Sequence, residues 1–260
     1  MYLKRVIPCL LLDKGGLYKT VKFKKPVYVG DPINAVKIFN EKEVDELIFL
    51  DITASTEKRK PDFKKIAEVA SETFMPFTYG GGISEFNDAK ELFRLGVEKI
   101  CINTAAALNP LLITQIAEQY GNQAIVASVD VKKSFFGKYE VMINRATKSI
   151  KTPLIEYCQQ MEKAGAGEIM LTSVDREGTW EGYDIDLLRQ VTTVVSIPVI
   201  ASGGAGNVEH FSEVVNLGGA SALAAGSMMV FQKKGMGVLI SFPERKVLDE
   251  IFNDFNALKP

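Results

Sequence analysis

The chain has 260 residues, of which 47% are apolar, so it is long enough for one large α/β domain or two small ones and is not a disordered chain. Lys and Arg number 31 and Asp and Glu number 32, which gives a net charge of -1. This balance supplies no general electrostatic reason to expect a nucleic acid or a membrane surface as partner. Any anionic ligand must therefore be bound by local groups.

The three cysteines are odd in number and widely spaced, and each lies inside an apolar run (Cys9, Cys101 and Cys158). This usage is typical of reduced core thiols in a cytoplasmic protein. No Cys/His cluster with metal-ligand spacing is present in the sequence, and we expect no cofactor. Met1 leads directly into a strand-like segment rather than a signal peptide, and no run of about 18 apolar residues occurs, so the sequence predicts a cytoplasmic location.

Apolar segments of strand length alternate along the chain with longer segments of helical periodicity. Several of the helical segments begin with Pro and end with Gly, as helices commonly do. The predicted strands span residues 5–12, 46–53, 76–80, 99–103, 124–130, 168–174, 198–202 and 221–226. The predicted helices span residues 32–44, 61–73, 85–96, 110–121, 152–165, 184–195, 208–219 and 243–255.

The predicted strands are almost continuously apolar, which indicates that both of their faces are buried, as in a parallel sheet. Eight strand-helix units in this length favour a (β/α)8 TIM barrel that occupies residues 1–260 as one domain. A doubly wound open sheet is the structural alternative, although such sheets rarely need eight units of such even length.

The chain also repeats itself at a shift of about 120 residues. PFTYGGGI at 76–83 resembles PVIASGGAG at 198–206, and RLGVEKICINTAA at 94–106 resembles NLGGASALAAGSM at 216–228. The repeat predicts two half-barrels, about 1–122 and 123–260. A similar shift lays VIPCLLLDK over IVASVDVKK and places Leu11 opposite Asp130, so one half-barrel ends its first strand with a carboxylate and the other with leucine.

The reactive groups of such a barrel lie at the C-terminal ends of its strands. Glycine clusters follow the third strand at 80–82 and the seventh at 203–204, and Asn103-Thr104 and Gly226-Ser227 follow the next strands. Glycine lets backbone N–H groups approach an oxyanion, so each half-barrel offers a phosphate cradle, and two cradles suit a substrate phosphorylated at both ends. The alternative is that the glycines only permit tight turns.

Four further side chains are candidates at the same mouth. Asp130 follows an apolar strand, where a partly desolvated carboxyl group can act as general acid or base; the alternative is a loop-capping aspartate. Asp175 and Glu177 follow the sixth strand and could bind substrate hydroxyls. Lys19 lies in segment 15–30, which has the composition of a mobile loop, so it could close over an anion or be one more solvated charge.

A second group of charged residues lies at the opposite, N-terminal face. Arg5, Glu46, Lys99 and Glu168 start the first, second, fourth and sixth strands and should point inward around the bottom opening. Such bottom-face features normally serve stability, and here a gate is also conceivable.

Taken together, these residues resemble the cyclase subunit of imidazole glycerol phosphate synthase, the HisF type, along essentially the whole chain. The matching stretches are KRVIPCL, DELIFLDITAS, PFTYGGGI, INTAA, NPLLITQIAEQYG, GAGEIMLTSVDREGT and PVIASGGAG. The resemblance implies an enzyme subunit with a glutaminase docked on the N-terminal face and ammonia that crosses the barrel to a substrate held by two phosphates. It implies an ammonia gate formed by Arg5, Glu46, Lys99 and Glu168, and phosphate cradles containing Gly82, Asn103, Thr104, Gly204, Ala225 and Gly226.

One position departs from the family pattern. The resemblance implies two catalytic aspartates, at the ends of strands one and five, and this chain keeps Asp130 but has Leu11 at the other position. Leucine cannot move a proton, and general acid-base help is typically worth about 10² to 10⁴ in rate. Asp13 lies on the same strand face but about 6 to 7 Å further along, and it is the alternative source of the missing acid.

The segments VIPCLLL and GGLYKTVKF resemble the divergent branch of this family that is described as acetamidino-modification proteins of surface-sugar biosynthesis. That resemblance implies a barrel that supplies ammonia from its glutaminase to a separate sugar amidotransferase, a role in which the strand-one acid is dispensable. An authentic histidine-pathway cyclase that tolerates Leu11 and a non-catalytic channel that only activates the glutaminase are the alternatives.

Overall fold

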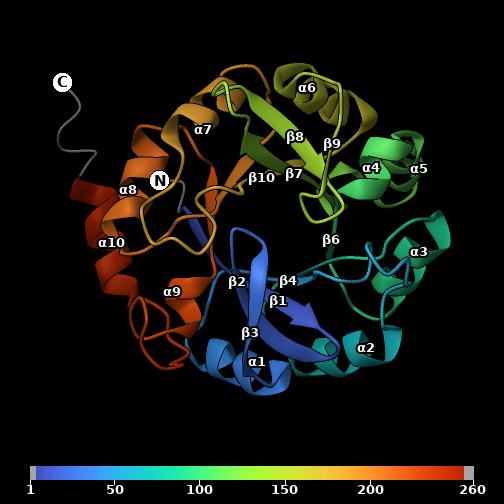
Figure 1. Cartoon of the computed structure of the whole chain (residues 1–260). Coiled ribbons are helices and arrows are strands. Elements are labelled where there is room, and N and C mark those ends of the chain that lie inside the picture. The colour runs from blue at the N-terminus through green and yellow to red at the C-terminus, as the bar shows by residue number, and fades with distance from the viewer. Residues whose placement is uncertain (1–3, 255–260) are drawn as a thin grey trace.

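Eight parallel strands close into a barrel in the computed structural model, which describes residues 4–254 (Figure 1). Each strand pairs in parallel with the next, and the last pairs with the first, so the predicted (β/α)8 barrel is confirmed and the open sheet is excluded. In barrel order the strands are β1 (Arg5–Asp13), β4 (Leu47–Asp51), β5 (Phe77–Gly80), β6 (Lys99–Ile102), β7 (Ile125–Lys133), β10 (Glu168–Ser173), β11 (Val199–Ser202) and β12 (Ala222–Ala225).

Helices form the outer ring of the barrel (Figure 1). The predicted helices are found as α1 (Pro32–Glu41), α2 (Phe63–Glu72), α3 (Phe86–Arg94), α5 (Leu111–Tyr120), α6 (Leu154–Ala164), α7 (Ile185–Thr192), α8 (Glu209–Asn216) and α10 (Arg245–Asp254). The last predicted residue of the final helix, Phe255, lies outside the described residues. Aspartate side chains cap the starts of three helices by accepting backbone N–H groups, Asp31 at α1, Asp62 at α2 and Asp184 at α7.

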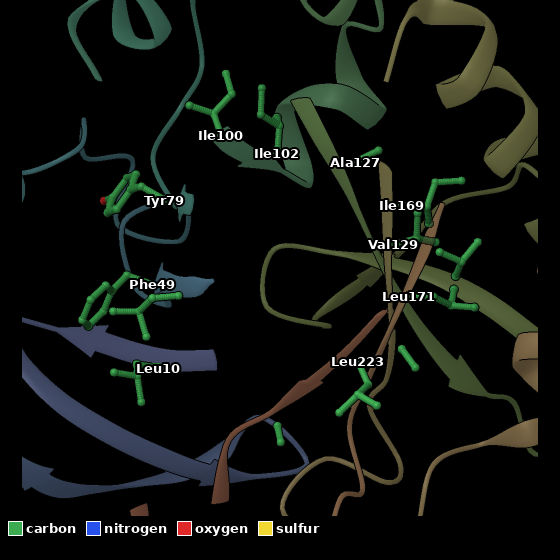
Figure 2. Packing of buried hydrophobic residues seen from close by; sticks show 14 of the residues in the cluster. Leu10, Phe49, Tyr79, Ile100, Ile102, Ala127, Val129, Ile169, Leu171 and Leu223 are labelled. Atoms are coloured by element: carbon green, nitrogen blue, oxygen red, sulfur yellow. The ribbon is translucent and has the colours of Figure 1, made fainter. Parts of the chain in front are cut away.

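The barrel strands bury both faces, which explains their continuous apolar sequence. Side chains such as Leu10, Phe49 and Leu171 point outward and pack in the layer between strands and helices (Figure 2). The residues that alternate with them, such as Ile48 and Met170, point inward and fill the barrel. The three cysteines are buried and free, as the sequence predicts.

Two antiparallel hairpins rise from the barrel, one after β1 and one after β7. The first follows β1 and consists of β2 (Gly16–Val21) and β3 (Lys24–Gly30), and the second follows β7 and consists of β8 (Tyr139–Ile143) and β9 (Lys148–Ser149). The prediction of a loop at 15–30 is therefore wrong. Its many lysines obscure the apolar alternation that would have indicated strands, because the hairpin has one face toward solvent.

Short helices follow two barrel strands at the mouth, α4 (Thr104–Leu108) after β6 and α9 (Ser227–Val230) after β12, and a 3₁₀ turn spans Asn122–Ala124. Within residues 4–254, no helix has the length and apolar character needed to cross a membrane.

Candidate functional site

A cavity of about 1200 Å³, counted with its open mouth, lies at the C-terminal ends of the barrel strands. This is the end at which barrels of this kind carry their sites. Most of the side chains and glycines that the sequence singles out line it together: Leu11, Lys19, Gly82, Asn103, Thr104, Asp130, Glu177, Gly204 and Gly226.

Two of the residues predicted at the mouth do not line the cavity. Asp175 accepts a hydrogen bond from the backbone N–H of Lys133 (2.8 Å) and so ties the loop after β10 to the end of β7. Ala225 packs its side chain outward among the residues between strands and helices, while its neighbours Ala224 and Gly226 face the cavity.

Asp130 lies near the end of the cavity side of β7 and is paired in register with Thr172 of β10. Its side chain is only 9% exposed. Burial raises the pKa of its carboxyl group from 3.8 to about 7, and Glu177 adds to the rise, while the Ser128 and Thr172 hydroxyls lower the pKa by hydrogen bonding to the carboxylate. A carboxyl group with this pKa exchanges protons near neutral pH, as a general acid or base must.

Leu11 occupies the related place on β1, where it is 8% exposed and lines the same cavity with Cys9 and Leu50. This side of the mouth is therefore apolar. Burial raises the pKa of the Cys9 thiol to about 11, although the nearby Lys19 ammonium lowers it, so Cys9 stays protonated and is a poor proton acceptor near neutral pH. None of the three residues replaces a carboxylate.

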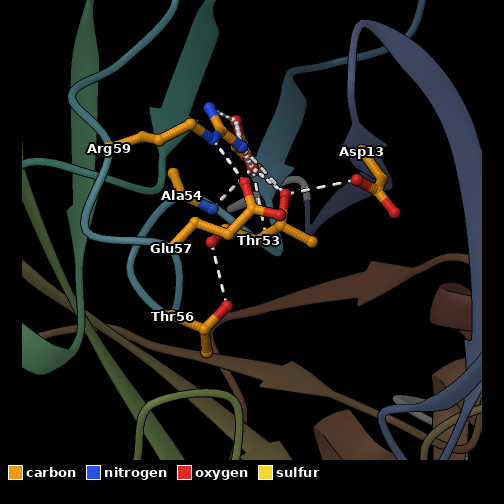
Figure 3. Close-up of polar contacts among 7 residues, drawn as sticks. Asp13, Thr53, Ala54, Thr56, Glu57 and Arg59 are labelled. Carbon is orange, nitrogen blue, oxygen red and sulfur yellow. Dashed lines mark hydrogen bonds and ion pairs between the residues drawn. The ribbon is translucent and has the colours of Figure 1, made fainter.

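Asp13 does not line the cavity beside Leu11. Figure 3 shows its carboxylate turned toward Thr53, whose hydroxyl oxygen lies 3.2 Å from one carboxylate oxygen of Asp13 and 3.2 Å from one of Asp51. Asp51 also accepts the Ala54 N–H (2.9 Å) and lies 3.4 Å from the Arg59 guanidinium. Asp13 thus belongs to the network that holds the loop after β4, and it is not among the residues that line the cavity.

The two glycine pairs have both a structural and a potential binding role. A β-carbon on Gly81 would lie 2.4 Å from the carbonyl oxygen of Asp51, and one on Gly203 would lie 2.6 Å from that of Ser173, so each loop packs tightly on the loop of the preceding strand. Turn geometry therefore does require glycine. Among the described residues, however, no acceptor binds the N–H groups of Gly82 and Gly204, which both line the cavity and remain available to an oxyanion.

Lys19 is not a solvated charge, because it lies on β2 and is only 6% exposed. Its ammonium group packs against Gly226 at the end of β12: a β-carbon there would lie 2.2 Å from Nζ. No hydrogen bond or ion pair joins this ammonium group to another of residues 4–254. Glu177, nearby, accepts the Thr20 hydroxyl (3.1 Å) and the Phe23 N–H (3.0 Å) and so fastens the β2–β3 hairpin over the mouth.

The four charged residues at the N-terminal face form one connected ion cluster. Arg5 binds Glu46 (2.5 Å) and Glu168 (2.8 Å), and Lys99 binds the same two carboxylates (3.1 and 3.3 Å). Burial lowers the pKa of the Arg5 guanidinium, but the Glu168 and Glu46 carboxylates together raise it by more. The pKa of Arg5 therefore lies above its usual value. Oε2 of Glu168 is buried without a hydrogen-bond partner in the described structure.

Two cavity residues were missed by the sequence interpretation. Ser202 lines the mouth beside the second glycine pair, and Arg145 reaches it from the β8–β9 turn. Ser202 lies directly next to a motif that was recognised, so the repeat could have indicated it. Arg145 could not be found in this way, because the turn that carries it belongs to a hairpin that was not predicted.

The fold and the position of the cavity define a (β/α)8-barrel protein with its candidate site at the C-terminal mouth. The family model described as "Histidine biosynthesis protein" matches residues 5–234, and the chain belongs to this family. Within it, the chain is a HisF-type, cyclase-type subunit related to those of imidazole glycerol phosphate synthase.

Three relatives carry that assignment. "Putative imidazole glycerol phosphate synthase subunit hisF2" of Pseudomonas aeruginosa is 50% identical over 249 residues, which cover 96% of this chain and 99% of the relative. "Putative imidazole glycerol phosphate synthase subunit hisF3" of Vibrio vulnificus is 46% identical over 94% of both chains. "Imidazole glycerol phosphate synthase subunit HisF" of Natranaerobius thermophilus is 42% identical over 95% of this chain and 98% of the relative.

Proposed function

We propose that this chain is the synthase subunit of a two-component glutamine amidotransferase, and that it takes ammonia from a glutaminase docked on the N-terminal face of the barrel. In this proposal the ammonia passes through the barrel and serves the amidination of a surface sugar, in which a separate amidotransferase converts an acetamido to an acetamidino group. The ring-closing activity of the family is lost.

The observation that carries the proposal is the contrast between the two ends of the barrel. At the bottom, all four charged residues are present and joined by ion pairs. At the mouth, Asp130 faces a related position that holds Leu11, and Asp13 is bound to Thr53 instead. A protein that only conducts ammonia needs the ion cluster at the bottom, whereas ring closure by a pair of acids needs a second carboxylate at the mouth, where this chain has Leu11.

The interior between the two ends is filled by apolar side chains, so a molecule that crosses it must be small and neutral. Its lining is apolar, with Ile7, Ile48, Val126, Met170 and Ala222 among the inward side chains. Neutral NH₃ loses little on entering such a region, whereas NH₄⁺ would have to leave its hydration shell. Ammonia released under the ion cluster would therefore travel in its nucleophilic form.

The test mixes the purified chain with a candidate glutaminase subunit from the same organism and amide-labelled [¹⁵N]glutamine. We expect the chain to stimulate glutamine hydrolysis. Lys99→Met should reduce either this stimulation or the amount of ¹⁵N-labelled ammonia that reaches the mouth of the barrel. Lys90→Met on α3 is the control, since Lys90 lies outside the ion cluster. No stimulation by the wild-type chain, or equal stimulation by Lys99→Met with equal delivery, contradicts the proposal. A neighbouring sugar amidotransferase gene would support the amidination branch, and a location in a histidine operon would contradict it.

An authentic imidazole glycerol phosphate synthase cyclase is the second candidate. The pKa of Asp130 near 7 and the free N–H groups of Gly82 and Gly204 favour it, because they suit acid-base chemistry on a ligand with two phosphates. This candidate requires ammonium-dependent turnover of the bisphosphorylated aminoimidazole-carboxamide ribonucleotide and rescue of a histidine auxotroph that lacks its own cyclase.

A non-catalytic channel that only activates the glutaminase is the third candidate. It is favoured by the apolar side of the mouth around Leu11 and Leu50. It predicts that Asp130→Asn leaves ammonia delivery unchanged. A large loss of delivery in a folded Asp130→Asn protein would count against it.

A further inference from the structure

Arg145 is a charged residue at the mouth to which neither the motifs nor the family resemblance assigns a role. It lies in the turn between β8 and β9 and lines the cavity. Its one hydrogen bond within residues 4–254 runs from Nε to the carbonyl oxygen of Phe23 (3.2 Å), and no carboxylate there pairs with it. The guanidinium charge is thus uncompensated beside a cavity.

The geometry of the turn does not account for an arginine. Asn144, Arg145 and Ala146 have φ angles of 52°, 55° and 55°, in the left-handed region that Asn tolerates and that Arg and Ala rarely adopt. Glycine is the residue that adopts this region without a steric cost. A glycine at 145 would suit the backbone better, so the reason for arginine must lie in its side chain.

The turn is fastened to one side of the mouth. The N–H of Asn144 donates to the Thr104 hydroxyl (3.1 Å), and the Asn103 amide donates to the carbonyl oxygens of Ser128 (3.0 Å) and Met142 (3.3 Å). Asn103 and Thr104 both line the cavity at the end of β6. Arg145 therefore starts directly beside the part of the rim that carries one candidate phosphate cradle.

From there the side chain reaches the turn of the other hairpin. The Phe23 N–H donates to the Glu177 carboxylate, and the Phe23 carbonyl oxygen accepts a hydrogen bond from Nε of Arg145. The contact with Glu177 thus holds the Phe23 carbonyl group in place for the guanidinium. Because Nε is occupied, the two Nη groups are the donors left for a ligand, and they bind no other group in the described part of the chain. A guanidinium binds phosphate oxygens through two parallel N–H groups, which a single ammonium cannot do.

Each hairpin thus brings to the mouth one cation that has no ion-pair partner within residues 4–254. Lys19 comes from β2 and lies beside Gly226, and Arg145 comes from the β8–β9 turn, where its neighbour Asn144 contacts Thr104. We propose that Arg145 binds a phosphate group of the ligand in the half of the mouth formed by Asn103 and Thr104, and that Phe23 holds it there beforehand. This inference requires a phosphorylated ligand at the mouth, as the cyclase candidate does, and it does not depend on ammonia supply to a sugar.

The test is an NMR titration with inorganic phosphate that reads the backbone amide signals of Thr104 and Gly226 as reporters of the two halves. We expect wild-type chain to respond at both. Arg145→Met should weaken the phosphate affinity read at Thr104 by about tenfold or more. The affinity read at Gly226 should stay within about twofold of wild type. Arg145→Lys should show a phosphate affinity at Thr104 between those of wild type and Arg145→Met, because lysine keeps the positive charge and loses the two parallel N–H donors. Arg94→Met, which removes an exposed arginine of α3, should match wild type at both reporters.

Arg145→Gly guards against failure to fold, since glycine suits this turn, and it should show the same loss at Thr104 as Arg145→Met. Unchanged phosphate binding at Thr104 in both variants would overturn the role of Arg145 and leave the proposed function standing. Absence of any response in wild-type chain, at either reporter, would overturn this inference together with the phosphorylated ligand of the cyclase candidate.

Discussion

Replacing Asp130 by asparagine should make the protein more stable above neutral pH. The side chain is 9% exposed, and burial raises its pKa from 3.8 to about 7. The folded protein therefore favours the protonated carboxyl group, whereas the unfolded chain ionises it at lower pH. As the pH rises from about 4 to about 7, the unfolded state releases its proton first, and the folded state loses stability relative to it.

The size of this effect follows from the pKa difference. It is about 3 pH units, and each unit corresponds to about 1.4 kcal/mol, so the ionised Asp130 costs the folded protein about 4 kcal/mol at pH 8. Asparagine avoids this cost because it is neutral at every pH. It also retains groups that hydrogen-bond to the hydroxyls of Ser128 and Thr172.

Urea unfolding of both proteins at pH 4, 5, 6, 7 and 8 measures the difference in unfolding free energy. We expect the two proteins to be similar at pH 4 and Asp130→Asn to be more stable by up to about 4 kcal/mol at pH 8. Asp175→Asn, at a rim carboxylate that binds the Lys133 N–H, is the control and should bring no such gain. A stability difference that stays constant from pH 4 to pH 8 would refute the reasoning.

Three further predictions concern the frame around the site. Glu46→Gln should lower the unfolding free energy by about 3 kcal/mol in urea melts, because this 2% exposed carboxylate binds two cations; a loss below about 1 kcal/mol would contradict it. Gly204→Ala should lower the unfolding free energy by about 3 kcal/mol or more in the same measurement, since its β-carbon would lie 2.1 Å from the Gly182 carbonyl oxygen. Gly137→Ala is the control: its φ is 78° but the space around it is open, so it should cost about 1 kcal/mol. Cys9, whose pKa is about 11, should resist thiol reagents at pH 8 until the protein unfolds; fast reaction of the native protein would show that the mouth opens further than the structure indicates.

The barrel could be predicted from the sequence because its strands are buried on both faces. All eight predicted strands lie within a few residues of the observed ones, as in 168–174 against β10 (Glu168–Ser173). The two hairpins follow a different rule. Segment 15–30 has one face toward solvent and four lysines, so its pattern resembles a polar loop although Lys19 itself is buried.

The candidate site shows the same division. Asp130 lies on barrel strand β7, and Gly82 and Gly204 follow β5 and β11, so their place at the mouth could be inferred from the closure of the barrel alone. Arg145 reaches the mouth only through hairpin geometry and a contact with Phe23, 122 residues away in the chain. Asp13 lies on the expected strand, but its partner Thr53 comes from the neighbouring loop, and no local pattern reveals that contact.

Ammonium-dependent cyclase turnover, measured with the purified chain and the bisphosphorylated aminoimidazole-carboxamide ribonucleotide, tests the central claim most directly. The claim is that the barrel has kept its ammonia route and lost ring closure at Leu11. We expect no product from the wild-type chain and product from Leu11→Asp, which restores a carboxylate opposite Asp130. Efficient product formation by the wild-type chain would contradict the claim.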